Sequence, residues 1–119
     1  LRIACVVALG APAWAALAFE VILNGLAMFN HANATLPKAL EPFVRAIFVT
    51  PDMHRVHHSV DPVETHSNFG FNLSVWDRMF GVYRAAPAKG QEGMTIGLPI
   101  LRDERELRLD RMLTQPFRE

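Results

Sequence analysis

Three of the five histidines of this sequence lie within five consecutive positions, in the spacing H-x-x-H-H. They are His54, His57 and His58, and the pair Thr50-Pro51 stands shortly before them. Threonine is a favourable N-cap and proline suits the first helical position, so the pattern predicts a helix that begins here. On such a helix the histidines occupy positions i, i+3 and i+4 of one face, with Cβ atoms about 5–6 Å apart. Three imidazoles at this spacing can point at a common centre, which suits a metal ion.

The other residues narrow the chemistry that this cluster could support. A structural zinc site usually needs four ligands, often cysteine, and the single cysteine, Cys5, is remote in sequence. Arginine and valine follow His54, so the H-E-x-x-H pattern of metalloproteases is absent. Neither Ser59 nor Ser67 stands in the G-x-S-x-G context of a nucleophilic serine. Neutral imidazoles suit iron, zinc, copper or nickel, and the adjacent histidines favour a site with more than one ion.

The composition predicts one domain with a strongly apolar beginning. The chain has 119 residues, of which half are hydrophobic, and residues 3–19 contain no charged side chain. Twelve basic residues balance twelve acidic ones, so no overall positive field would recruit nucleic acid. With one cysteine, an internal disulfide is excluded.

The apolar stretch at residues 1–30 is long enough to cross a bilayer, which takes about 20 residues. Pro12 should kink such a helix, and Glu20 interrupts its second half. We therefore expect a membrane-embedded helical region over residues 1–30. The alternatives are a buried core helix and a signal peptide with a cleavage-like A-W-A at 13–15, although the apolar character continues as far as Phe29.

A fourth histidine, His31, lies where the apolar stretch ends, at the expected boundary between lipid and water. A lone histidine at such a place is more often an interfacial residue than a ligand. Residues 38–49 carry apolar side chains at helical spacing, with Lys38, Glu41 and Arg45 opposite them. This pattern predicts an amphipathic helix, either at a membrane interface or in an ordinary core, which could bring His31 near the other histidines.

The sequence after the histidines predicts a polar loop at 60–68 and a helix at 71–80. The apolar stripe of that helix indicates a buried position behind the metal site, and Gly81 suits its C-terminal stop. Asp77 and Arg78 are either exposed or orient the metal ligands.

The remaining residues form a C-terminal tail without catalytic signals. Glycines and prolines at 84–99 predict a loop. Asp103 should cap a last helix, with Glu106 three positions later in an arrangement like a capping box.

Several segments, taken together in their order, resemble the fatty acid hydroxylase / sterol desaturase superfamily. They are T-P-D-M-H-R-V-H-H-S at 50–59, S-N-F-G at 67–70, W-D-R-M-F-G at 76–81, F-N-H-A-N upstream at 29–33, and T-I-G-L at 95–98 in the tail. The H-x-x-H-H spacing alone is a weak signal, but its combination with N-F-G and W-D-R-x-F-G is specific.

The resemblance implies an all-α fold, a membrane-embedded helical bundle whose histidine-bearing helices lie on the cytoplasmic side. It implies two iron ions held by histidines, and hydroxylation or desaturation of C–H bonds in a fatty acyl, sterol or related lipid with O2. Two electrons would come from a donor protein of the ferredoxin or cytochrome b5 type. The chain would be the C-terminal part of one domain, with a membrane helical region at 1–30, histidine motifs at 31–83 and a tail at 84–119.

The resemblance also carries over individual residues. The metal ligands would be His31, His54, His57 and His58. The candidates for orienting them are His66, Asn68, Asp77 and Arg78, of which His66 stands where the family is not consistently histidine.

The family's two further histidine motifs, H-x-x-x-H and another H-x-x-H-H, are absent from this sequence. We therefore expect this chain to carry half of a di-iron site, to belong to a longer protein and to be inactive alone. The competing interpretations are a non-redox metal protein, either a zinc hydrolase or a structural membrane protein, and a truncated product without function.

Overall fold

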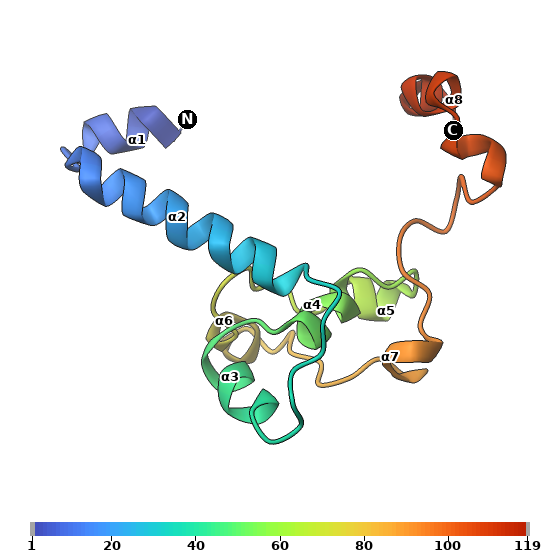
Figure 1. Cartoon of the computed structure of the whole chain (residues 1–119), viewed down its shortest axis with the longest axis horizontal. Helices are drawn as coiled ribbons and strands as arrows, with labels where there is room; N and C mark the ends of the chain where they lie inside the picture. Colours follow the sequence, from blue (N-terminus) through green and yellow to red (C-terminus); the bar gives the residue numbers. More distant parts are fainter. Residues whose placement is uncertain (1, 119) are drawn as a thin grey trace.

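The computed structural model describes residues 2–118, which form helices joined by loops (Figure 1). The elements are α1 (Arg2–Ala8), α2 (Ala13–Asn30), α3 (Glu41–Ile47), α4 (Pro51–His57), α5 (Pro62–Thr65), α6 (Val75–Met79), α7 (Gly90–Gly93) and α8 (Leu109–Thr114), with the 3-10 turns η1 (Glu104–Leu107) and η2 (Gln115–Phe117). These residues contain two isolated β-bridges and no β-strand. The prediction of an all-α fold is confirmed.

The chain consists of a small centre from which two arms project. Helices α1 and α2 form one arm, and the segment from η1 to η2 forms the other, while α3 to α7 surround the centre (Figure 1). The radius of gyration is 17.6 Å, whereas a closed globule of this length would have about 13–14 Å. The arms therefore expose much more surface than a self-contained domain would.

The first arm is a helical hairpin and not one kinked helix. Gly10 has a φ of +62° and Pro12 is the residue before the first turn of α2. Since glycine adopts this backbone conformation freely and proline cannot continue a helix, the expected kink at Pro12 is a complete break. Arg2 then pairs with Glu20 at 3.0 Å, which links the start of α1 to the middle of α2.

Among the helices of residues 2–118, α2 is the one that is long and apolar enough to cross a membrane. Its exposed apolar side chains include Trp14, Leu17, Phe19 and Ile22. Within this helix the buried residue is Asn30, at the end that faces the centre. Most of the surface of α2 therefore faces away from the rest of the chain.

The centre is held together largely by polar groups. Among the described residues the buried apolar side chains are Val49, Met53 and Val56. The buried polar residues are more numerous: Asn30, Thr50, His54, Ser59, Glu64, Ser67, Asn68, Ser74 and Asp77. Buried polar groups must be hydrogen-bonded to be tolerated, so this part of the fold depends on specific bonds more than on apolar packing.

The apolar stripe expected to be buried at 71–80 is instead exposed. Helix α6 spans only five residues, and the side chains of Trp76 and Phe80 are about half or more exposed, at 49% and 71%. Asp77 points inward in their place, because its carboxylate accepts hydrogen bonds from the Gly70 amide at 2.9 and 3.0 Å. The stop at Gly81 is as predicted, with a φ of +71°.

The amphipathic helix predicted at 38–49 is also shorter, and its apolar side chains Leu40, Phe43 and Ile47 are exposed. Arg45 and Glu41 of α3 form an ion pair on the inner side. Both α3 and α6 thus present apolar side chains outward.

The last predicted helix is divided into η1, α8 and η2. Asp103 caps η1 by accepting a hydrogen bond from the Arg105 amide at 2.9 Å. Glu106 does not complete a capping box, because its carboxylate pairs with Arg118. The predicted loop at 84–99 contains the single turn α7.

Candidate metal centre

Helix α4 carries the H-x-x-H-H pattern and begins as predicted. Thr50 is its N-cap and accepts a hydrogen bond from the Met53 amide at 3.4 Å, while Pro51 occupies the first turn. The helix ends at His57, so His58 is its C-cap residue. The rings of the three histidines stay close together, with the centroids of each pair 4.8 to 5.7 Å apart.

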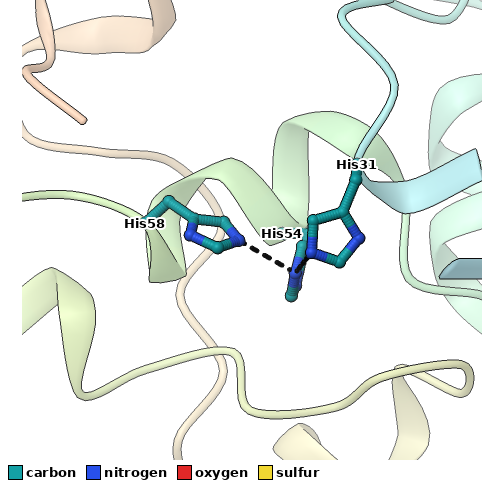
Figure 2. A group of neighbouring side chains, drawn as sticks. All are labelled: His31, His54 and His58. Atoms are coloured by element: carbon teal, nitrogen blue, oxygen red, sulfur yellow. Dashed lines mark hydrogen bonds between the residues drawn. The ribbon is translucent and has the colours of Figure 1, made fainter. Parts of the chain in front are cut away.

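The structure brings together His31, His54 and His58 (Figure 2), which we call the histidine trio. The Nε2 atom of His54 lies 3.1 Å from Nε2 of His31 and 3.2 Å from Nε2 of His58. His31 reaches this place from the end of α2. Two nitrogens bound to one ion at about 2.1 Å stand roughly 3.0–3.4 Å apart, so these two spacings fit a common metal ion.

The hydrogen bonds of the trio also fit a cation. Nδ1 of His31 lies 2.8 Å from the carbonyl oxygen of Ala27, which can only accept, so this nitrogen carries the proton and Nε2 has a free lone pair. Nε2 of His54 faces two other nitrogens, although a ring nitrogen has only one hydrogen or one lone pair to offer. A cation between three lone pairs would satisfy all of them, which a proton cannot do.

The environment keeps His54 and His58 uncharged. Burial, and then repulsion from the three neighbouring histidines, lowers the pKa of His54 from its ordinary value of 6.5 to about 4. Partial desolvation first, and then repulsion from His57 and His31, also lowers the pKa of His58. Metal ligation requires neutral imidazole, so these rings are already in the ligating state at neutral pH.

The lowered pKa of His54 predicts how the stability of the metal-free protein depends on pH. The unfolded chain binds a proton near pH 6.5 and the folded chain only near pH 4, so this contribution to the free energy of unfolding is complete above 6.5 and is lost as the pH falls toward 4. The slope for one such proton is about 1.4 kcal/mol per pH unit. Urea unfolding in detergent with a chelator measures it. His54→Gln should flatten the dependence, whereas His66→Ala should not; an equal slope in both variants would contradict the assignment.

His57 lies beside the trio but outside it. Its Nδ1 is 3.1 Å from the Ser67 carbonyl oxygen, so this nitrogen donates and Nε2 keeps a free lone pair. Its ring stacks near that of His54, with centroids 5.7 Å apart, and contacts the ring of Phe69 at 5.4 Å. A carbonyl that fixes the tautomer and orientation of an imidazole is a frequent partner of metal-binding histidines.

Asn68 holds the loop that supplies this carbonyl. Its side chain is fully buried, and Nδ2 donates to the carbonyls of Met53 and Arg84, each at 2.9 Å. The side-chain oxygen accepts from the Arg84 amide at 2.8 Å. The φ of Asn68 is +49°, a conformation that asparagine tolerates better than most residues. Asn68 thus joins α4 to the segment after α6 and fixes the position of the adjacent Ser67.

The other two predicted orienting residues, Asp77 and Arg78, form hydrogen bonds with Gly70, Ser74 and Arg45 and not with the histidines. Asp77 binds the Gly70 amide, and a Cβ atom at Gly70 would stand only 2.5 Å from the Asp77 carboxylate, so glycine is required there. Arg78 donates to the Ser74 hydroxyl at 2.6 Å and lies 4.4 Å from the ring centre of Tyr83.

His66 is exposed at the C-cap of α5. It lies outside the trio. Sequence reasoning thus selected the three trio residues, but the distinct surroundings of His57 and the bracing role of Asn68 become visible only in three dimensions.

Comparison with known proteins finds similarity to a family of hydroxylases and to individual lipid hydroxylases and monooxygenases. The sequence model of the family described as fatty acid hydroxylase matches residues 1–82. Ornithine lipid hydroxylase from Rhizobium tropici is 32% identical over 79 residues, which cover 66% of this chain and 23% of that protein. Alkylglycerol monooxygenase from Xenopus tropicalis is 43% identical over 49 residues (41% and 11% of the two chains), and that of Danio rerio is 40% identical over 63 residues (53% and 14%). The chain therefore spans less than a quarter of these relatives. No solved structure matches it.

Proposed function

We propose that this chain, which belongs to the fatty acid hydroxylase family, forms part of a membrane enzyme that oxidises C–H bonds of lipids with O2. The observation that carries this proposal is the convergence of three Nε2 atoms from two separate elements. The names of the relatives describe a hydroxylase and monooxygenases of lipids, which supports the same class of reaction here. The substrate would be a fatty acyl, sterol or related lipid.

The metal would be iron, in a site for two ions. His31, His54 and His58 would hold one ion, and His57, whose ring centroid lies 5.7 Å from that of His54 and 5.6 Å from that of His58, would contribute to the second. Bound iron would supply the reduction of O2 and the oxidation of the lipid. Four imidazoles cannot fill the coordination of two ions, so we propose that further ligands come from residues outside this chain and that the chain alone is inactive.

The chain's own residues hold the ligands and shape their surroundings. Burial of His54 keeps its ring neutral, and the carbonyls of Ala27 and Ser67 fix the tautomers of His31 and His57. Phe71 stands 6.3 Å from the ring of His31, and Phe69 flanks His57. These aromatic rings would give a hydrocarbon substrate an apolar approach to the histidines.

The apolar surface of the chain supports a location in the membrane. Helix α2 exposes nearly its whole length, and α3 and α6 present apolar side chains outward. Monomeric soluble proteins rarely expose apolar patches of this extent. We propose an integral-membrane helical bundle, with the membrane region at 1–30, the histidine motifs of 31–83 at the cytoplasmic boundary and a tail at 84–119. A ferredoxin or cytochrome b5 type of protein would deliver the electrons.

The proposal can be tested on the whole protein, purified in detergent. We expect iron to be the bound metal and the lipid product to incorporate oxygen from isotopically labelled O2, or to gain a double bond. His57→Ala should lower both the iron content and the product, whereas His66→Ala, at an exposed position, should change neither. Stoichiometric zinc without lipid oxidation would overturn the proposal in favour of a zinc hydrolase, since three histidines also suit catalytic zinc.

A further inference from the structure

A segment of the tail pairs with the backbone at His58, one member of the histidine trio. We call residues 95–97 the strap; it follows α7, in the orange part of the chain (Figure 1). The Val60 amide donates to the Thr95 carbonyl at 2.9 Å, and the Gly97 amide donates to the His58 carbonyl at 2.9 Å. Ser59 and Ile96 form an antiparallel bridge between these bonds. The strap lies beyond residues 1–82, the part of the chain that matches the family.

His58 needs such support more than the other ligands do. It is the C-cap of α4, so its carbonyl lies beyond the helical hydrogen bonds, and its side chain is exposed. His54, in contrast, lies within the helix and is buried. The peptide group that follows His58 has two hydrogen bonds: its amide, that of Ser59, donates to the Val56 carbonyl of α4 at 3.1 Å, and its carbonyl accepts from Gly97 of the strap.

The strap has a backbone conformation that requires glycine at position 97. The φ of Gly97 is +99°, where side chains other than glycine are strained. Arg102 then closes the turn by donating to the carbonyls of Ile96 at 3.2 Å and Leu98 at 2.7 Å. Gly97 and Arg102 thus shape the segment that bonds to His58.

We propose that Gly97 and Arg102 are positioning residues of the metal centre, because the strap they shape holds the backbone of His58 so that its Nε2 joins the trio. This inference rests on the proposed function, in which His58 binds a metal ion. It extends the site from α2 and α4 to the C-terminal tail.

The test is a titration of the metal-depleted whole protein with Co2+, followed by visible absorption. Gly97→Ala is expected to weaken binding about tenfold, the size typical of residues that orient a ligand, and to alter the absorption spectrum. The matched control is Gly10→Ala, which imposes positive-φ strain in the distant α1–α2 turn. Arg102→Gln should also weaken binding, whereas Arg108→Gln, which removes an arm residue paired with Asp110, should not.

A second measurement separates positioning from general destabilisation. In a His58→Ala background, adding Gly97→Ala should cost no further Co2+ affinity, because the ligand that the strap positions is already absent. Additive losses, or wild-type binding by both strap variants, would overturn the role of the strap while leaving the proposed metal site intact. If His58→Ala itself binds Co2+ as the wild type does, the strap proposal and the ligand set of the proposed function fail together.

Discussion

Replacing His54 with alanine is expected to abolish metal binding by the trio and, with it, lipid oxidation. His54 is the central member: its Nε2 is the atom from which both other nitrogens stand at 3.1 and 3.2 Å (Figure 2). Without it, only two ligands remain, His31 and His58, and the side chain that contacts both of them is gone. Since substitutions that merely disturb a ligand's surroundings lower affinity 10–100-fold, roughly, losing this ligand should cost more than 100-fold.

Metal content after dialysis, measured by mass spectrometry, checks this expectation. His57→Ala should leave the ion of the trio in place and remove only metal that depends on the neighbouring position. His66→Ala should retain all of it, because His66 is exposed and outside the trio. A His54→Ala protein that keeps its full metal content would show that the trio is not the metal site.

The local part of the site could be predicted from the sequence. The start of α4 depends on a hydroxyl cap and a proline, both of which act within one turn, and the structure has both as predicted. The position of Gly81 could be predicted for the same reason, since glycine adopts the positive φ that a helix end requires without steric cost. Features of this kind need no knowledge of the remaining chain.

The meeting of His31 with His54 could not be derived from spacing. These residues are 23 positions apart, and their contact depends on how α2 ends and how the chain returns through α3. The upstream histidine entered the predicted ligand set only through resemblance to a family. The separation of His57 from the trio was also hidden, because it involves the contact of its Nδ1 with the Ser67 carbonyl, which lies in the loop after α5.

The orientation of α6 shows a further limit of sequence patterns. Helical periodicity indicates that apolar side chains share a face, but it does not say whether that face meets the protein interior or a lipid. In this chain Asp77 determines which face of α6 points inward, because its carboxylate accepts a hydrogen bond from the Gly70 amide inside the fold. The apolar residues on the other side, such as Trp76, are therefore turned outward.

Asn68 is the residue whose loss should most weaken the fold around the site. Asn68→Ala removes three side-chain hydrogen bonds, to the Met53 carbonyl and to both backbone groups of Arg84. At roughly 1 kcal/mol each, and more where the partner stays buried and unpaired, the free energy of unfolding should fall by at least about 3 kcal/mol. Thermal unfolding in detergent and hydrogen exchange of the Arg84 amide measure the change.

The same substitution separates a role in the fold from a role in the site. Asn68→Gly loses the same bonds but accepts the φ of +49° without strain, so it should be less destabilised than Asn68→Ala. Asn33→Ala, at an exposed position, should change neither stability nor exchange. Both Asn68 variants should release the neighbouring Ser67 carbonyl, so that nitrogen NMR finds His57 as a mixture of tautomers and no longer protonated mainly at Nδ1. If the Arg84 amide stays protected and His57 keeps one tautomer, Asn68 does not connect the loop to the histidines.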